Sequence, residues 1–73
     1  MIDMETIYSL LAVDMDGNET TEEFSERDYT NAVCRYGHAS SKPENRYVAL
    51  RRVDTDWTSN EEITTLFEKG EAL

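Results

Sequence analysis

The sequence has few cysteines and prolines and no long hydrophobic run, so it lacks the residues that would cross-link a small protein or anchor it in a membrane. Among its 73 residues there is one cysteine, Cys34, and one proline, Pro43. A single cysteine excludes an intramolecular disulfide framework, which small secreted domains usually need. The longest apolar stretch, residues 10–13, is too short to cross a bilayer, and residues 1–5 lack the basic start of a signal peptide. We therefore expect a cytoplasmic protein with no membrane partner.

Basic residues are also scarce. Seven Lys and Arg residues stand against 16 Asp and Glu residues, which gives a formal net charge of −9 at pH 7. Direct binding to DNA or RNA needs a cluster of Lys and Arg against the phosphates, so the composition argues against a nucleic-acid partner. A chain of 73 residues buries only a thin core. We treat 1–73 as a single domain and expect flexible ends at 1–5 and 70–73.

The charges are segregated along the chain. Residues 1–28 contain nine acids and one base, residues 29–53 one acid and five bases, and residues 54–73 six acids and one base. The net charges of these segments are −8, +4 and −5. Two interpretations stay open: either Arg51 and Arg52 neutralise hairpin carboxylates across a sheet, or the acids form a negative recognition surface.

The first third of the chain predicts a β-hairpin. Apolar residues alternate along residues 6–15, which is typical of a strand. Asp16-Gly17 follows, and this dipeptide between two extended runs indicates a tight turn. The return strand, residues 19–24, contains three glutamates, which favours an edge position in the sheet.

The middle of the chain predicts a helix over 26–36. Ser25 and Asp28 have the spacing of a capping box, and Gly37 stands where a glycine often ends a helix. An apolar stripe follows at helical spacing. Its members are Tyr29, Ala32, Val33 and Tyr36.

The last third predicts one more strand and a short helix. Residues 46–53 are rich in strand-forming residues. Ile63, Leu66 and Phe67 follow two possible capping boxes at helical spacing, and Gly70 would end that helix. The expected fold class is α+β. It is a small antiparallel three-stranded sheet with one main helix, in the order ββαβ, plus a short C-terminal helix.

No pattern predicts a catalytic, cofactor-binding or metal site, so we expect a protein that is not an enzyme. Residues 10–17 resemble the first motif of haloacid-dehalogenase phosphatases, with Asp14 as nucleophile and Asp16 as general acid. That fold needs a parallel sheet with crossover helices, which 73 residues cannot supply. A calcium loop starting at Asp14 fails because Glu19 stands where glycine is required. Cys34 and His38 are too few ligands for zinc.

The format of the chain points to a binding protein. Its length, its acidity, the hairpin around 14–18, the single helix 26–36 and the strand 46–53 are together similar to small acidic phage-encoded proteins that bind host RNA polymerase. The most similar kind are the transcription regulators of lytic Xanthomonas phages. The resemblance implies a viral, non-enzymatic inhibitor of transcription initiation with a role in antitermination and host takeover. It implies contact with a basic region of the β′ subunit in the host cytoplasm.

No signature motif accompanies this resemblance, so the partner-binding residues are predicted from charge alone. Trp57 is either a lid on the core or an anchor at the interface. We expect a monomer in the free state, with no cofactor. Two alternatives stay open, a DNA-mimic inhibitor of a restriction or repair enzyme and a small oligomeric structural protein. The predicted partner-binding residues are Asp3, Glu5, Asp14, Asp16, Glu19, Glu22, Glu23 and Trp57.

Overall fold

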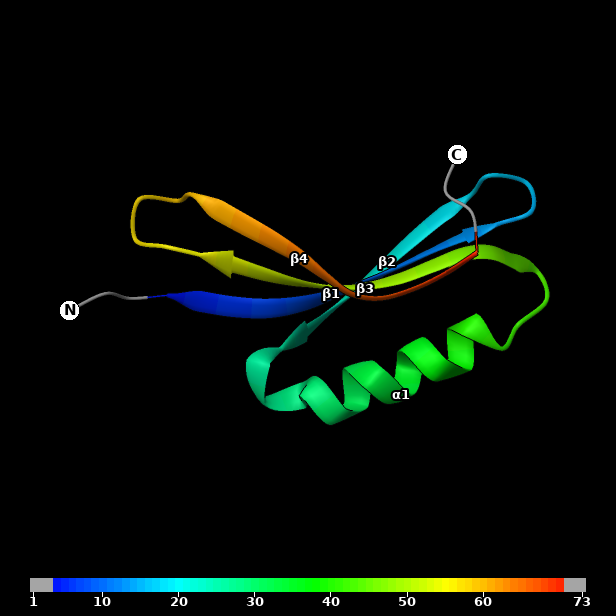
Figure 1. Ribbon diagram of the computed structural model, residues 1–73, viewed down its shortest axis with the longest axis horizontal. Coiled ribbons are helices and arrows are strands. Elements are labelled where there is room, and N and C mark those ends of the chain that lie inside the picture. The colour runs from blue at the N-terminus through cyan, green and yellow to red at the C-terminus, as the bar shows by residue number, and fades with distance from the viewer. Residues whose placement is uncertain (1–3, 71–73) are drawn as a thin grey trace.

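Four strands and one helix make up the described part of the chain, residues 4–70 of a computed structural model. The four strands form one antiparallel sheet in the order β2-β1-β3-β4, and α1 lies along one face of it (Figure 1). Asp3, which was predicted to contact a partner, falls outside the described residues. The elements in chain order are β1 (Glu5–Asp14), β2 (Glu19–Ser25), the 3-10 turn η1 (Glu26–Asp28), α1 (Tyr29–Ser40), β3 (Asn45–Thr55) and β4 (Glu61–Gly70).

The prediction of a three-stranded sheet with a C-terminal helix was wrong, because the C-terminal segment is a fourth strand of the sheet. β4 pairs with β3 from Thr55 opposite Glu61 onward. A register shift between Leu50 and Arg51 marks a β-bulge, and Leu66 and Phe67 both reach the side of the sheet that faces α1. The bulge places two consecutive residues of β4 on the same side of the sheet. In the sequence, Ile63, Leu66 and Phe67 therefore have a spacing that is also typical of an amphipathic helix.

The helix prediction was wrong at its two ends. Ser25 makes no side-chain capping bond, and the α-helix starts only at Tyr29, after η1. Helix α1 also runs through Gly37 to Ser40, because the last carbonyls have other partners. Asn45 Nδ2 donates to the Ala39 carbonyl at 2.9 Å, and Lys69 Nζ donates to the Ser40 carbonyl at 2.9 Å. These bonds satisfy the carbonyls that a glycine-ended cap would otherwise satisfy.

The main core lies between α1 and the sheet. Val48 and Leu50 of the central strand β3 are almost fully buried there, and Ala32 of α1 is fully buried against the strands. Val33, Tyr36 and Ala39 extend this contact along the helix. The remaining buried side chains of this core are Tyr8, Leu10 and Phe24. One face of the sheet is therefore closed by the chain's own helix.

The predicted β1–β2 hairpin is present, with a turn one residue longer than a two-residue loop. Asp14 N donates to the Asn18 carbonyl at 3.0 Å, and Gly17 N donates to the Asp14 carbonyl at 3.1 Å. Asp14 Oδ1 accepts the backbone N–H groups of Asp16 and Asn18 at 2.9 Å each. Within this turn only Gly17 has a positive φ, 86°. This is the three-residue loop that ends in a left-handed residue.

Candidate protein-binding surface

The face of the sheet opposite α1 is not covered by any helix or strand of residues 4–70 (Figure 1). We call it the open face. Residues directly opposite each other in an antiparallel pair share a face, so the register defines its members. They are Glu5, Ile7, Ser9, Leu11 and Val13 of β1, Glu19, Thr21, Glu23 and Ser25 of β2, Tyr47, Ala49, Arg51, Val53 and Thr55 of β3, and Glu61, Ile63, Thr65 and Glu68 of β4.

The centre of the open face is apolar. At one end, Val13, Tyr47 and Ala49 form a second small core together with Leu11. Tyr47 Oη donates to Glu68 Oε2 at 2.9 Å, which ties the side chain on β3 to the neighbouring strand β4. At the other end, a row across three strands is formed by Ile7, Val53 and Ile63, of which Ile63 is 59% exposed. Val13, Tyr47 and Ala49 are already buried in this small core. The apolar surface available for contact is therefore formed by the exposed Ile63 and the half-buried side chains of Ile7, Leu11 and Val53.

The outer strands of the open face are acidic. Glu19 and Glu23 lie on β2, Glu61 and Glu68 lie on β4, and Glu5 adds a fifth carboxylate at the end of β1. Arg51 is the one basic residue on this face, which leaves a formal net charge of −4. The open face therefore combines an apolar centre on β1 and β3 with a negatively charged rim.

Ion pairs do not neutralise this rim. Within residues 4–70 there are two ion pairs, Arg35 with Glu22 and Arg52 with Asp54, each at 3.1 Å. Both lie on the side of the sheet that faces α1, because Glu22 is opposite Leu10 and Arg52 is opposite Tyr8. Arg52 pairs within its own strand, and Arg51 forms no ion pair. Cross-sheet neutralisation by Arg51 and Arg52, one of the two interpretations of the sequence, does not hold.

The β3–β4 turn carries Trp57 at one end of the open face. Its side chain is 74% exposed, so it is not a lid on the core. Asp56 Oδ1 accepts the backbone N–H groups of Thr58 and Asn60 at 2.9 and 3.0 Å and the Thr58 hydroxyl at 2.6 Å. These hydrogen bonds, the one from the Thr58 hydroxyl first, hold the pKa of Asp56 below its usual value. The turn thus presents an exposed indole on an ordered loop.

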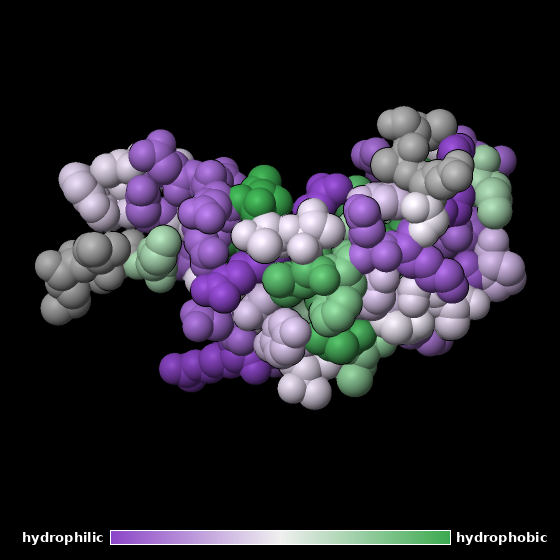
Figure 2. Space-filling view, viewed as in Figure 1, coloured by the Kyte–Doolittle hydropathy of each residue, from purple (hydrophilic) through white to green (hydrophobic). Residues whose placement is uncertain are grey.

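The β3–β4 turn repeats the geometry of the β1–β2 turn. Asp56 N donates to the Asn60 carbonyl at 3.0 Å, and Ser59 has a positive φ, 68°, at the position of Gly17. In each turn the residue after the capping aspartate is a large exposed apolar one, Trp57 or Met15. The molecule measures 45 × 24 × 15 Å, and in Figure 2 hydrophilic residues make up most of its two ends, while the most hydrophobic residues lie near its middle.

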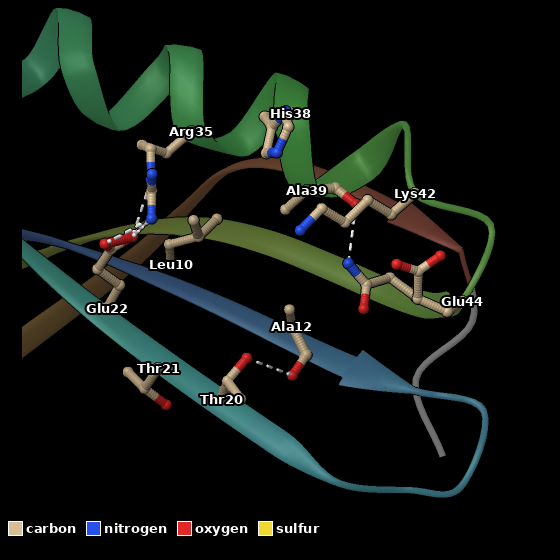
Figure 3. A pocket seen from close by; sticks show the side chains of 11 residues that line it. Leu10, Ala12, Thr20, Thr21, Glu22, Arg35, His38, Ala39, Lys42 and Glu44 are labelled. Atoms are coloured by element: carbon tan, nitrogen blue, oxygen red, sulfur yellow. Dashed lines mark hydrogen bonds and ion pairs between the residues drawn. The ribbon is translucent and has the colours of Figure 1, made fainter.

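A cleft of about 430 Å³ on the other side of the sheet has no comparable character. Figure 3 shows Arg35 of α1 reaching across to Glu22 of β2, and its Nε and Nη2 each donate to a carboxylate oxygen at 3.1 Å. Lys42 and Glu44 add one charge of each sign, so the formal charge of the lining balances. Residues 4–70 also contain no group of three or more potential metal ligands, and no helix in that range is long and apolar enough to cross a membrane.

The structure divides the predicted partner-binding residues among three places. Glu5, Glu19 and Glu23 lie on the open face. Glu22 lies on the side facing α1, paired with Arg35. Asp14 is the last residue of β1, Asp16 lies in the turn between β1 and β2, and Trp57 lies in the turn between β3 and β4.

The predicted residues therefore do not form one continuous surface. β1 has ten residues and is roughly 33 Å long, so Glu5 and Asp14 lie at opposite ends of the sheet. Asp14 is also occupied by its own turn, because hydrogen bonds from Asn18 hold its pKa below the usual value.

Sequence reasoning missed the residues that β4 contributes. Glu61, Ile63 and Glu68 join the open face only because residues 61–70 are a strand. The run Ile63-Thr64-Thr65 was the available signal, since three consecutive β-branched residues favour a strand over a helix. The chain matches no protein-family model, no curated protein and no solved structure.

Proposed function

We propose that this protein is a non-enzymatic binding module that docks its open face on a basic surface of a partner protein. The observation that carries the proposal is the set of five glutamates without ion pairs around an apolar centre, on a sheet face that residues 4–70 leave uncovered. Buried apolar contacts supply most of the affinity of such interfaces. Charge complementarity speeds the encounter and selects the partner.

Trp57 fits the role of an anchor at the end of this surface. Trp is among the residues most enriched at interface hot spots, where it fills a pocket on the partner. Its turn is held by the hydrogen bonds to Asp56, so little order has to be gained on binding. Glu61 follows the turn directly and brings a carboxylate to the same end of the molecule.

We further propose a nucleic-acid-handling enzyme as the partner. Such enzymes carry large basic surfaces for phosphate, and these complement an acidic rim. Bacterial RNA polymerase, through its β′ subunit, is the specific candidate that the resemblance to phage transcription regulators implies. Occupation of a basic channel by the module would inhibit initiation.

Neighbouring glutamates of β4 provide a matched test of this function. Glu61 lies on the open face and Glu62, opposite Asp54, lies on the other side, and both are exposed. Wild type, Glu61→Lys and Glu62→Lys are immobilised and offered purified bacterial RNA polymerase at low and at moderate salt. We expect wild type and Glu62→Lys to retain it, Glu61→Lys to retain less, and salt to weaken all three. Equal retention by the two variants would contradict docking by the open face.

A further inference from the structure

We infer that the element of the partner that occupies the open face is a basic amphipathic α-helix. The inference rests on the proposed function, since it names the shape of the basic surface that the module binds. The open face has three features that bear on its occupant. These are the arrangement of charge across the strands, the way in which α1 already covers the opposite face, and the position of Arg51.

The width of the open face matches a helix. Its apolar side chains lie mainly on the central strands β1 and β3, and four of its five glutamates lie on the outer strands β2 and β4. Three interstrand spacings separate β2 from β4, which is about 14 Å. A helix with its side chains is about 10–12 Å across. A helix lying over β1 and β3 would therefore place its flanks above the two acidic strands.

The other face of the same sheet shows how such a helix is held. The apolar stripe of α1, with Ala32 and Val33, packs on the central strands. Arg35 on its flank extends outward and donates two hydrogen bonds to Glu22 on β2. Next to Glu22 in sequence, Glu23 points to the open face and forms no ion pair in residues 4–70. The open face thus offers a partner's helix the same kind of acceptor that Arg35 uses on the covered face.

Two other occupants fit the open face less well. A second copy of this chain, docked through the same face, would bring two sets of glutamates together, and like charges in close contact oppose binding. An extended strand binds by adding to the edge of a sheet, where free backbone groups are available, and not by lying over its face. A helix with Lys or Arg on both flanks of an apolar stripe satisfies the apolar centre and the acidic rim together.

Replacing Arg51 should change the affinity for a basic helix and for an acidic helix in opposite directions. It lies between the row of Ile7 and Val53 and the row of Leu11 and Ala49, in the middle of the apolar centre. The apolar stripe of a docked helix would have to cover this positive charge, and the partner's basic flanks would repel it. Replacing Arg51 by Leu should therefore strengthen binding of a basic helix and weaken binding of an acidic one.

The experiment uses designed peptides as probes and backbone amide chemical shifts of the isotope-labelled full chain as the readout. The first probe is a Leu/Lys peptide of about 18 residues with leucines spaced three and four apart, about 27 Å long as a helix. The second has the same composition with strict alternation, which favours an extended chain. The third has Glu in place of Lys.

We expect the helical Leu/Lys peptide to bind tightest and to shift the amides of Ile7, Val53 and Ile63. Arg51→Leu should tighten it at least twofold, and Glu61→Lys should weaken it about two- to fivefold, with Glu62→Lys unchanged. If the alternating peptide binds the open face as well as the helical one, the helix inference is wrong and the proposed function stands. If neither basic peptide shifts the open face, or if the acidic peptide binds tighter, both are overturned.

Discussion

The two turns allow one energetic argument to be tested twice within the same chain. Gly17 and Ser59 occupy the same position of the same three-residue loop, with φ of 86° and 68°. In the folded state, a residue with a Cβ is destabilised by about 1–2 kcal/mol in this left-handed region. Glycine at the same position also stabilises the unfolded state by about 0.4–1 kcal/mol, because it gives the unfolded chain more conformational freedom, and this offsets part of its advantage. Glycine should therefore be favoured by roughly 0.5–1 kcal/mol at either position.

The perturbation is a reciprocal pair of substitutions. Gly17→Ser should lower the free energy of unfolding by about 0.5–1 kcal/mol, and Ser59→Gly should raise it by about the same amount. A Cβ added at Gly17 meets nothing within 4 Å, so a steric clash adds nothing to the cost. The Ser59 hydroxyl is not a partner in the hydrogen bonds of its turn, so its removal loses no bond.

Urea unfolding and thermal melting measure the effect. For a domain of this size, 0.5–1 kcal/mol corresponds to a shift of roughly 2–8 °C in Tm. The double variant should melt close to wild type, because the two turns lie at opposite ends of the molecule and their effects should add. A Tm that falls with Ser59→Gly, or that does not change with Gly17→Ser, would refute the reasoning about φ.

Two further predictions concern the helix and the response to pH. Gly37→Ala should raise the free energy of unfolding by roughly 0.5–1 kcal/mol, since Gly37 is inside α1 and an added Cβ meets nothing within 4 Å; a lower urea midpoint would contradict this. Hydrogen bonds, from Asn18, Thr6 and Thr58 respectively, hold the pKa values of Asp14, Asp54 and Asp56 below 3.8. Their stabilisation is complete above that value and is lost as the pH falls through the lowered pKa values, so the urea midpoint should fall in acid. A variant with Asn at all three positions should show a smaller fall, and an equal fall would assign the acid sensitivity to other groups.

Local patterns were sufficient to place most of the regular structure. The alternation in residues 6–15 and the Asp16-Gly17 turn predicted β1 and its hairpin, and residues 46–53 predicted most of β3. These segments have one strong periodicity each. The end of α1 was misplaced because its last carbonyls are satisfied by Asn45 and Lys69, which are distant in the sequence. When residues outside the helix satisfy its last carbonyls, the sequence of the helix itself does not indicate where it ends.

Strand β4 could not be recognised from its own apolar spacing. The bulge opposite Leu50 brings Leu66 and Phe67 to one side, and together with Ile63 they imitate a helix in the sequence. The open face depended on this strand, so its acidic rim was predicted only in part. Charge counting selected Glu22 and Glu23 together, although adjacent residues of a strand point to opposite faces and only Glu23 remains without an ion pair.

The strand order β2-β1-β3-β4 determines at which stage of folding the open face forms. Each hairpin joins neighbouring segments of chain, whereas β1 and β3 pair residues as far apart as Glu5 and Thr55. Closing that long loop is the entropically costly step, so we expect the two hairpins to form early and to dock along β1 and β3 afterwards. The apolar centre of the open face is split between these two strands. Neither hairpin carries it alone, and the open face is complete only in a chain that has finished folding.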